Sequence, residues 1–179
     1  MREKLSIPRF VPDRNLPEYT FIPGEAPHPI NDPEGHSYGK PEPSPASLDP
    51  GNWKQSGSYL FGIDLFNHGF YWEAHEEWEG LWHATGHTTG AGDFLKGLIK
   101  LAAAGVKMRQ RNEHGKTKHS GDAGEIFRNF QERGIEKYVG LSLQTLVEFA
   151  RDIGGHPDLD SQPDPWEPKP IFTERLLPQ

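Results

Sequence analysis

Apolar side chains recur at the spacing of an α-helix through the middle of the chain. Residues 91–111 are the clearest case, because an apolar face begins at Phe94 and Leu98 while lysines occupy the other side. The same spacing predicts four further helices, and a loop rich in Gly and Thr separates two of them. We expect helices at about 53–66, 70–84, 91–111, 120–138 and 141–153, with the loop at 85–92.

The positions of the prolines and the absence of strand-like alternation indicate the fold class. Eleven of the 17 prolines lie at or before Pro50 and six lie at or after Pro157, so the middle of the chain contains none. Proline interrupts helices and removes a hydrogen-bond donor from a sheet, so both ends must be extended or irregular. No segment keeps the alternation of a half-buried strand. We therefore predict an all-α protein: a compact antiparallel bundle of four to five helices with extended proline-rich arms at both ends.

These boundaries divide the chain into three parts. We expect an N-terminal arm at residues 1–50, a helical domain at 51–156 and a C-terminal tail at 157–179. The N-terminal arm carries several apolar side chains: Phe10, Val11, Tyr19, Phe21, Ile22 and Ile30. Because burial of such side chains is favourable, we expect the arm to pack on the helical core as an ordered segment.

Composition excludes several classes of protein. A length of 179 residues and a mass of 20.2 kDa suit one domain with a real core. A net charge of -7 argues against a general nucleic-acid binder and against binding to acidic membranes. No window approaches the roughly 18 apolar residues of a membrane span, and the N-terminus lacks the apolar run of a signal peptide. We therefore expect a cytoplasmic protein that binds neither nucleic acid nor membrane.

The predicted helix at 70–84 carries the strongest candidate for a functional site. At about 100° per residue, His75 and Glu79 stand one turn apart on the same side of that helix. Four aromatic residues lie within roughly 60° of this pair: Tyr71, Trp72, Trp78 and Trp82. We expect this aromatic face to be buried. A buried imidazole and carboxylate are costly unless they are paired or bind a ligand.

A histidine and a glutamate one turn apart offer a metal one nitrogen and one oxygen. Because the chain contains no cysteine, a metal must bind through histidine and carboxylate, and we expect a divalent ion: Zn, Mn or Fe. The order of His75, Glu76 and Glu79 parallels the His-Glu-x-x-His pattern of zinc hydrolases, with Glu in the second ligand position. By that analogy Glu76 is the general base of a metal-dependent hydrolase that acts on an unknown small-molecule substrate.

Two ligands do not complete such a site, since zinc takes three protein ligands and a water. His83 lies roughly 12 Å from His75 along the helix axis, and His68 is similarly remote, so neither can share its metal. Further ligands must come from another segment. His28 and His36 in the N-terminal arm are the candidates, and the alternative for each is a solvated loop histidine.

Other residues would surround the metal ligands. The four aromatic residues would form the wall of the site, although such a set also suits a helix core. Glu73 and Arg109 would support the ligands, and Glu73 falls with Glu77 on the opposite helical face. Arg109 projects from the apolar side of the next helix, where it would reach an inner carboxylate such as Glu79 or form a structural pair.

The stretch from Leu65 to Trp82, followed by residues 94–103, resembles domain-of-unknown-function family 309. The hallmark of that family is His-x-x-x-Glu-x-x-Trp/Tyr, matched by His75, Glu79 and Trp82, and the resemblance covers roughly residues 59–153. It implies an all-helical fold and metal binding, and members sometimes carry the label of metal-dependent hydrolases. Three lysines depart from the family pattern: Lys96 and Lys100, where members tend to have Gln, and Lys116, where a small residue commonly follows Gly.

Two other interpretations of the motif remain open. Residues 67–74 have the turn-then-helix cadence of a tetratricopeptide unit, and residues 111–116 repeat it weakly about 45 residues later, beyond the usual period of about 34. In a helical interaction module of this kind, or in a small-molecule binding protein, His75 and Glu79 would be a buried structural pair. A homodimer also remains open as the assembly.

Overall fold

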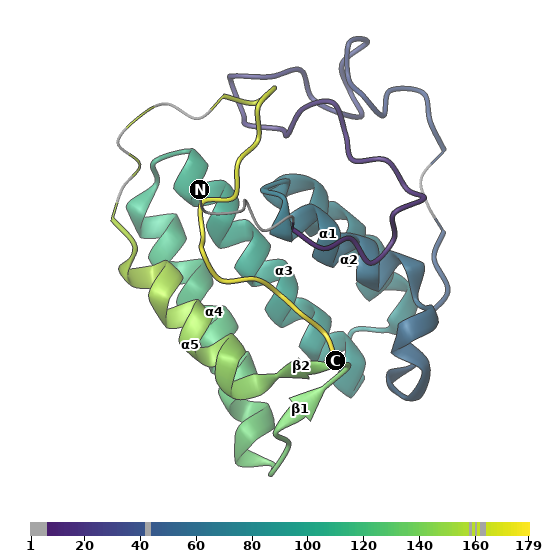
Figure 1. Cartoon of the computed structure of the whole chain (residues 1–179), viewed down its shortest axis with the longest axis vertical. Coiled ribbons are helices and arrows are strands. Elements are labelled where there is room, and N and C mark those ends of the chain that lie inside the picture. Colours follow the sequence, from purple (N-terminus) through teal and green to yellow (C-terminus); the bar gives the residue numbers. More distant parts are fainter. Residues whose placement is uncertain (1–6, 42–43, 158, 160, 162–163) are drawn as a thin grey trace, which may run out of the picture.

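Five α-helices, preceded by a short 3-10 helix, make up most of the middle of the chain (Figure 1). The structure is a computed structural model that describes residues 7–41, 44–157, 159, 161 and 164–179. Its helices are η1 (Pro50–Gln55), α1 (Gly57–Asn67), α2 (Tyr71–Thr85), α3 (Gly90–Arg109), α4 (Glu113–Glu132) and α5 (Leu143–Gly155). Two short antiparallel strands, β1 (Lys137–Tyr138) and β2 (Leu141–Ser142), lie between α4 and α5. The prediction of an all-α bundle is confirmed.

The largest difference from the predicted helix ends concerns α4, which spans Glu113–Glu132 instead of about 120–138. Asn112 caps its start, since the side-chain oxygen accepts a hydrogen bond from Gly115 N at 2.8 Å. After α4, Val139 and Gly140 have positive φ angles of 38° and 82°, as in the two-residue turns that join hairpin strands. This hairpin was not predicted, because strands of two residues are too short to show a periodic pattern.

The core lies around α3. This helix contacts α2, α4 and α5, while α1 packs on α2. The buried face of α3 carries side chains without exposed surface: Phe94, Leu95, Leu98, Leu101 and Ala102. Each of the larger side chains contributes about 1.5–3 kcal/mol when it is buried. The apolar face that the sequence shows on residues 91–111 is therefore the centre of the bundle.

Gly105 allows α3 to approach α2 closely. A Cβ atom at this position would lie 2.6 Å from Cγ of Tyr71, a core residue of α2. We expect Gly105→Ala to lower the free energy of unfolding by about 1–3 kcal/mol, because the buried ring must shift. Gly80→Ala is the matched control: nothing lies within 4 Å of its added Cβ, so the change should stabilise α2 by about 0.5–1 kcal/mol. Urea denaturation measures the free energy of unfolding of both variants. If both substitutions change it in the same direction, the close contact between α3 and Tyr71 is contradicted.

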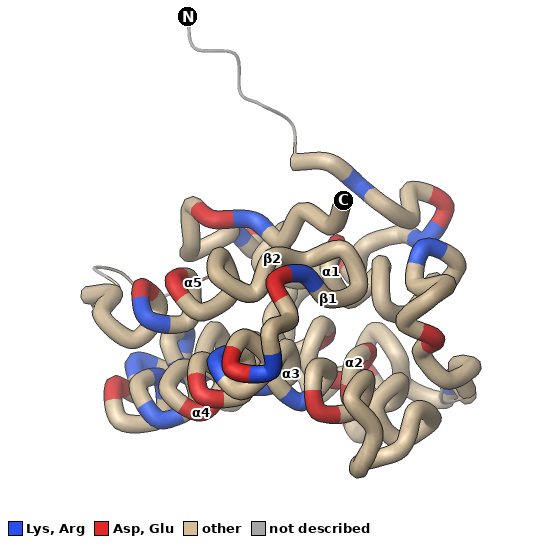
Figure 2. The backbone as a smooth tube through the Cα atoms, turned by 90° about the horizontal axis from the view of Figure 1, so that it is seen from below, with Lys and Arg blue, Asp and Glu red and all other residues tan. Residues whose placement is uncertain are grey.

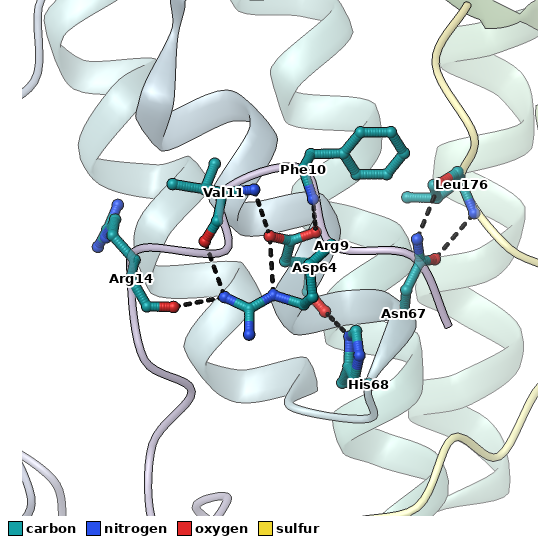
Figure 3. A network of polar contacts seen from close by, with 8 residues as sticks. All are labelled: Arg9, Phe10, Val11, Arg14, Asp64, Asn67, His68 and Leu176. Atoms are coloured by element: carbon teal, nitrogen blue, oxygen red, sulfur yellow. Dashed lines mark hydrogen bonds and ion pairs between the residues drawn. The ribbon is translucent and has the colours of Figure 1, made fainter. Parts of the chain in front are cut away.

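A buried carboxylate on α1 holds the N-terminal arm. Asp64 has no exposed surface, and Figure 3 shows its side chain turned toward the arm. It accepts hydrogen bonds from Arg9 Nε at 3.0 Å, Phe10 N at 2.7 Å and Val11 N at 2.8 Å. Hydrogen bonds to an ionised group are shorter and stronger than neutral ones. Asp64 therefore fixes the arm at residues 9–11.

Asn67, about one turn later on α1, holds the C-terminal tail. Its Nδ2 donates to Leu176 O at 2.8 Å, and its Oδ1 accepts from Leu176 N at 2.9 Å (Figure 3). The tail also contacts the N-terminal arm, since Thr20 N donates to Pro165 O at 2.9 Å. The described parts of the arm before η1 and of the tail contain no helix or strand. Helix α1 therefore contributes one contact to the arm and one to the tail.

Lys116, one of the three departures from the family pattern, is buried at the start of α4. Its Nζ lies 2.6 Å from Glu113 Oε2 and donates to His156 O, directly after α5. A positive charge is favourable at the C-terminal end of a helix. The lysine thus ties the start of α4 to the end of α5.

Acidic and basic residues are interspersed along α4 (Figure 2). Lys100 of α3 and Lys118 of α4 both contact Asp122, with Nζ to Oδ2 distances of 3.4 Å and 3.5 Å. Exposed ion pairs of this kind contribute roughly 0–1 kcal/mol. In the part of the chain that the structure describes, no helix combines the length and the apolar character needed to cross a membrane.

Candidate metal centre

Three side chains of α2 with metal-binding atoms lie together. Among the described residues, His75, Glu76 and Glu79 form the only group of three or more such side chains, and their ligand atoms lie within 4.8 Å of one another. His75 Nδ1 is 3.2 Å from Glu76 Oε1 and 4.0 Å from Glu79 Oε2. One helix therefore brings together a nitrogen and two carboxylate oxygens. We call these three residues the donor group.

The prediction that His75 and Glu79 are buried within an aromatic face is wrong. The exposed fractions of their side chains are 27% and 41%, and that of Glu76 is 37%. The core-facing stripe of α2 consists of Tyr71, Ala74, Trp78 and Leu81. The centre of that stripe lies about 80° from His75 around the helix. Only two of the four aromatic residues, Tyr71 and Trp78, belong to this stripe, so His75 lies at its edge and the two glutamates lie further from the core.

Two of the four aromatic residues expected around the donor group belong to the core. Tyr71 is 1% exposed and Trp78 has no exposed surface. Burial raises the pKa of Tyr71, and its hydroxyl accepts a hydrogen bond from Ile171 N at 2.8 Å. These contacts show that Tyr71 and Trp78 pack the bundle rather than line an open site.

The other two aromatic residues, Trp72 and Trp82, are half-buried. Trp72 contacts Phe21 of the N-terminal arm edge to face, with ring centroids 5.2 Å apart. Trp82 stacks on the exposed ring of His87 at 3.8 Å, and its Nε1 is buried without a hydrogen-bond partner in the described chain. They share the partly exposed side of α2 with the donor group.

The structure does not bring the two histidines of the N-terminal arm to the donor group. The ring of His28 lies 5.6 Å from that of Trp72, and its Nδ1 accepts a hydrogen bond from Ile30 N at 3.3 Å. His36 Nε2 lies 3.6 Å from Glu73 Oε1 instead. The arm thus places its histidines against other residues of α2.

Glu73 and Glu77 lie on the face of α2 opposite His75 and Glu79, and the N-terminal arm contacts both of them. Glu73 is 6% exposed and accepts hydrogen bonds from Thr20 Oγ1 and Phe21 N, both at 2.7 Å. Glu77 forms a bidentate pair with Arg14, with distances of 2.8 Å and 2.9 Å. Glu73 therefore anchors the arm rather than supporting the donor group.

Arg109 lies at the buried end of α3. Its Nη2 donates to Gly69 O at 2.9 Å and to Lys169 O in the C-terminal tail at 2.8 Å. Its guanidinium lies over the ring of Tyr71 at 5.3 Å. Burial lowers the pKa of Arg109, although the nearby Tyr71 and Glu73 oppose this shift. These contacts fix Arg109 between α2 and the tail, so they favour the structural alternative over a contact with Glu79.

Glu76 also borders a small hollow of about 40 Å³, lined further by Pro45, Ser58, Glu77 and Gly80. A water molecule needs about 10–15 Å³ of such space. The hollow therefore has room for water beside Glu76.

A family model matches residues 59–118, which run from α1 into α4 and include the donor group. Its description is Domain of unknown function (DUF309). We call these residues the DUF309 segment. The resemblance seen in the sequence is thereby confirmed for these residues. Comparisons with curated proteins and with solved structures give no match.

The DUF309 segment also contains the residues that hold the arm and the tail. Asp64, Asn67 and Glu73 lie within it, and each bonds a segment outside it. Asp64 and Asn67 were not predicted as anchors. The available signal was a polar residue on either side of Leu65 and Phe66, in a stretch where the apolar pattern predicts burial.

Proposed function

We propose that this chain binds a divalent metal ion, Zn, Mn or Fe, at His75 and Glu79 and uses it to hydrolyse a small molecule, with Glu76 as the general base. The observation that carries the proposal is the grouping of these three side chains on adjacent turns of α2. Imidazole nitrogen and carboxylate oxygen are donors that all three ions accept. The proposal extends the DUF309 assignment, which by itself gives no reaction.

The distances within the donor group fit such an ion. With metal–ligand bonds of about 2.0–2.2 Å, two ligands at a tetrahedral angle lie roughly 3.4 Å apart. His75 Nδ1 and Glu79 Oε2 are 4.0 Å apart, and both side chains are partly exposed, so a small rotation closes the difference. Partial exposure also leaves room for water and substrate, as in catalytic rather than structural metal sites.

Glu76 is the residue of this chain that would take part in hydrolysis, as the general base. A bound divalent metal would act as a Lewis acid and lower the pKa of water. Glu76 Oε1 lies 3.2 Å from His75 Nδ1, and the side chain borders the 40 Å³ hollow. A carboxylate this close to a metal ligand could accept a proton from a water molecule held beside the ion.

Metal titration of purified protein tests the binding. We expect His75→Ala and Glu79→Ala each to weaken binding of Zn, Mn or Fe by about 100-fold or more, since loss of a supporting group alone costs about 10- to 100-fold. His114→Ala and Glu132→Gln, both exposed on α4, are matched controls and should bind as the wild type does. Calorimetry on protein prepared without chelator measures the affinities. Equal and negligible binding in all five proteins would rule the site out.

Glu76→Gln separates a general base from a third ligand. If Glu76 is the base, the variant keeps its metal affinity and hydrolyses activated esters about 10²- to 10⁴-fold more slowly. If Glu76 is a ligand, the affinity falls as it does in His75→Ala. A metal-loaded wild type that hydrolyses neither activated phosphate esters nor activated carboxylate esters would contradict the hydrolase part of the proposal.

A further inference from the structure

A larger cavity lies between the N-terminal arm and the turn that joins α3 to α4. Its volume is about 410 Å³, and three arm residues, Ile22, Pro23 and Glu25, line one side. The other side is formed by the end of α3 and the turn: Lys107, Arg109, Gln110, Arg111 and Asn112. Small-molecule sites have volumes of about 300–1,000 Å³. The cavity shares no lining residue with the donor group, so it is a separate candidate site.

The lining of this cavity is basic. Lys107, Arg109 and Arg111 contribute three positive charges, and Glu25 contributes the one negative charge. Within the described residues, none of the three cations forms an ion pair with a carboxylate. Cations that line a cavity without such a partner favour the binding of an anion.

Arg109 gives the clearest sign of a missing partner. The residue is 4% exposed, and its Nε is buried without a hydrogen-bond partner in the described chain. The negative charge of Glu73 raises the pKa of Arg109, but this carboxylate already accepts hydrogen bonds from Thr20 and Phe21. A buried charge that lacks a carboxylate partner is costly. An anion in the cavity that Arg109 lines would supply the opposite charge.

Arg111 occupies a backbone position that favours glycine. Its φ is 54°, in the left-handed region. Arg111 N donates to Met108 O at 3.0 Å and Asn112 N donates to Lys107 O at 2.9 Å, which is the Schellman pattern at a helix C-terminus. The residue after the cap in this pattern is usually Gly. An unfavourable residue at such a position is often retained for function, and here it adds a charge to the cavity lining.

Lys107 is held in place by the start of α4. A Cβ atom on Gly115 would lie 2.9 Å from Cδ of Lys107, so the lysine stem packs directly on that glycine. Its Nζ donates to Gln110 Oε1 at 2.9 Å. The end of α3 and the turn after it therefore carry the cations on well-defined backbone, which lowers the entropy cost of binding an anion.

We propose that this cavity binds a small anionic molecule through a phosphate or carboxylate group that contacts Lys107, Arg109 and Arg111. Both groups match the planar fork of arginine, which can donate two parallel hydrogen bonds to either. The arm residue Glu25 on the facing wall opposes the anion and limits its affinity. The proposal is independent of metal binding at the donor group.

Calorimetric titration with pyrophosphate and with citrate at low ionic strength tests the proposal. We expect Arg111→Gly to weaken binding by about 10-fold or more, because one charge-assisted contact is lost. The variant should fold at least as well as the wild type, since glycine suits the positive φ. Glu25→Gln should strengthen binding several-fold, because it removes the opposing charge. Arg133→Gly, which removes an exposed arginine at the other end of α4, is the matched control and should leave binding unchanged.

The two probes distinguish the sources of the anionic group. Tighter binding of pyrophosphate indicates a phosphate compound, and tighter binding of citrate indicates a polycarboxylate. Binding that is equal in the wild type, Arg111→Gly and Arg133→Gly would overturn the proposal, as would failure of both anions to bind the folded wild type.

Discussion

Replacing Trp78 with alanine should lower the free energy of unfolding by about 3–5 kcal/mol. Trp78 has no exposed surface, and its ring lies directly on Gly62 of α1, where an added Cβ would be 2.1 Å from Nε1. Its Nε1 also donates to Tyr59 O at 3.2 Å. The substitution removes the contact of this ring with Gly62 and the hydrogen bond from Nε1 to Tyr59 O, and it leaves a cavity in the core. Since domains have about 5–15 kcal/mol in total, this is a large fraction of the stability.

Trp82→Ala is the matched control on the same helix. Trp82 is half-buried and stacks on the exposed ring of His87. Its replacement should cost about 1 kcal/mol, as is typical of substitutions outside the core. Urea denaturation followed by circular dichroism measures both variants. If the two substitutions lower the free energy of unfolding equally, the assignment of Trp78 to the core and Trp82 to the edge of its buried face is wrong.

Replacing Asp64 with alanine should release the N-terminal arm and lower the free energy of unfolding by about 2–3 kcal/mol. The carboxylate accepts three hydrogen bonds, from Arg9 Nε, Phe10 N and Val11 N. Removal of one partner of a buried ion pair costs about 3–5 kcal/mol when the other stays buried. The expected cost is smaller here, because a detached arm can return these donors to water.

Limited digestion with trypsin reports the release directly, because Arg9 and Arg14 lie in the segment that Asp64 holds. Cleavage after these residues should be faster in Asp64→Ala than in the wild type. Asp152→Ala is the control, since Asp152 is half-exposed on α5 and pairs with an exposed Arg151. Unchanged cleavage and an unchanged unfolding midpoint in Asp64→Ala would show that the arm is not held by this carboxylate.

Structural features that depend on a single helix could be predicted from the sequence. The apolar spacing from Phe94 to Ala102 predicted the central helix, because that face is buried wherever the neighbouring helices come from. The spacing of His75 and Glu79 placed their side chains together, because residues one turn apart are neighbours on any α-helix.

Features that depend on which segment covers one side of a helix could not be predicted from the sequence. Glu73 falls on the side of α2 that periodicity assigns to solvent, yet Thr20 and Phe21 bury it. His36 contacts this residue rather than the donor group for the same reason. The path of an arm without helix or strand follows from individual hydrogen bonds to side chains far away in the sequence, and no periodic pattern records them.

The anchors of the arm and the tail have a consequence for how the ends of this protein can evolve. Asp64, Glu73 and Asn67 bind mainly backbone groups: the N–H groups of Phe10, Val11 and Phe21, and both the N–H and the C=O of Leu176. Almost every residue type carries these groups. These hydrogen bonds therefore do not depend on which side chain each of the four attached positions carries, and packing alone constrains positions such as the buried Leu176. Selection on the anchoring itself acts instead on three polar residues inside the DUF309 segment.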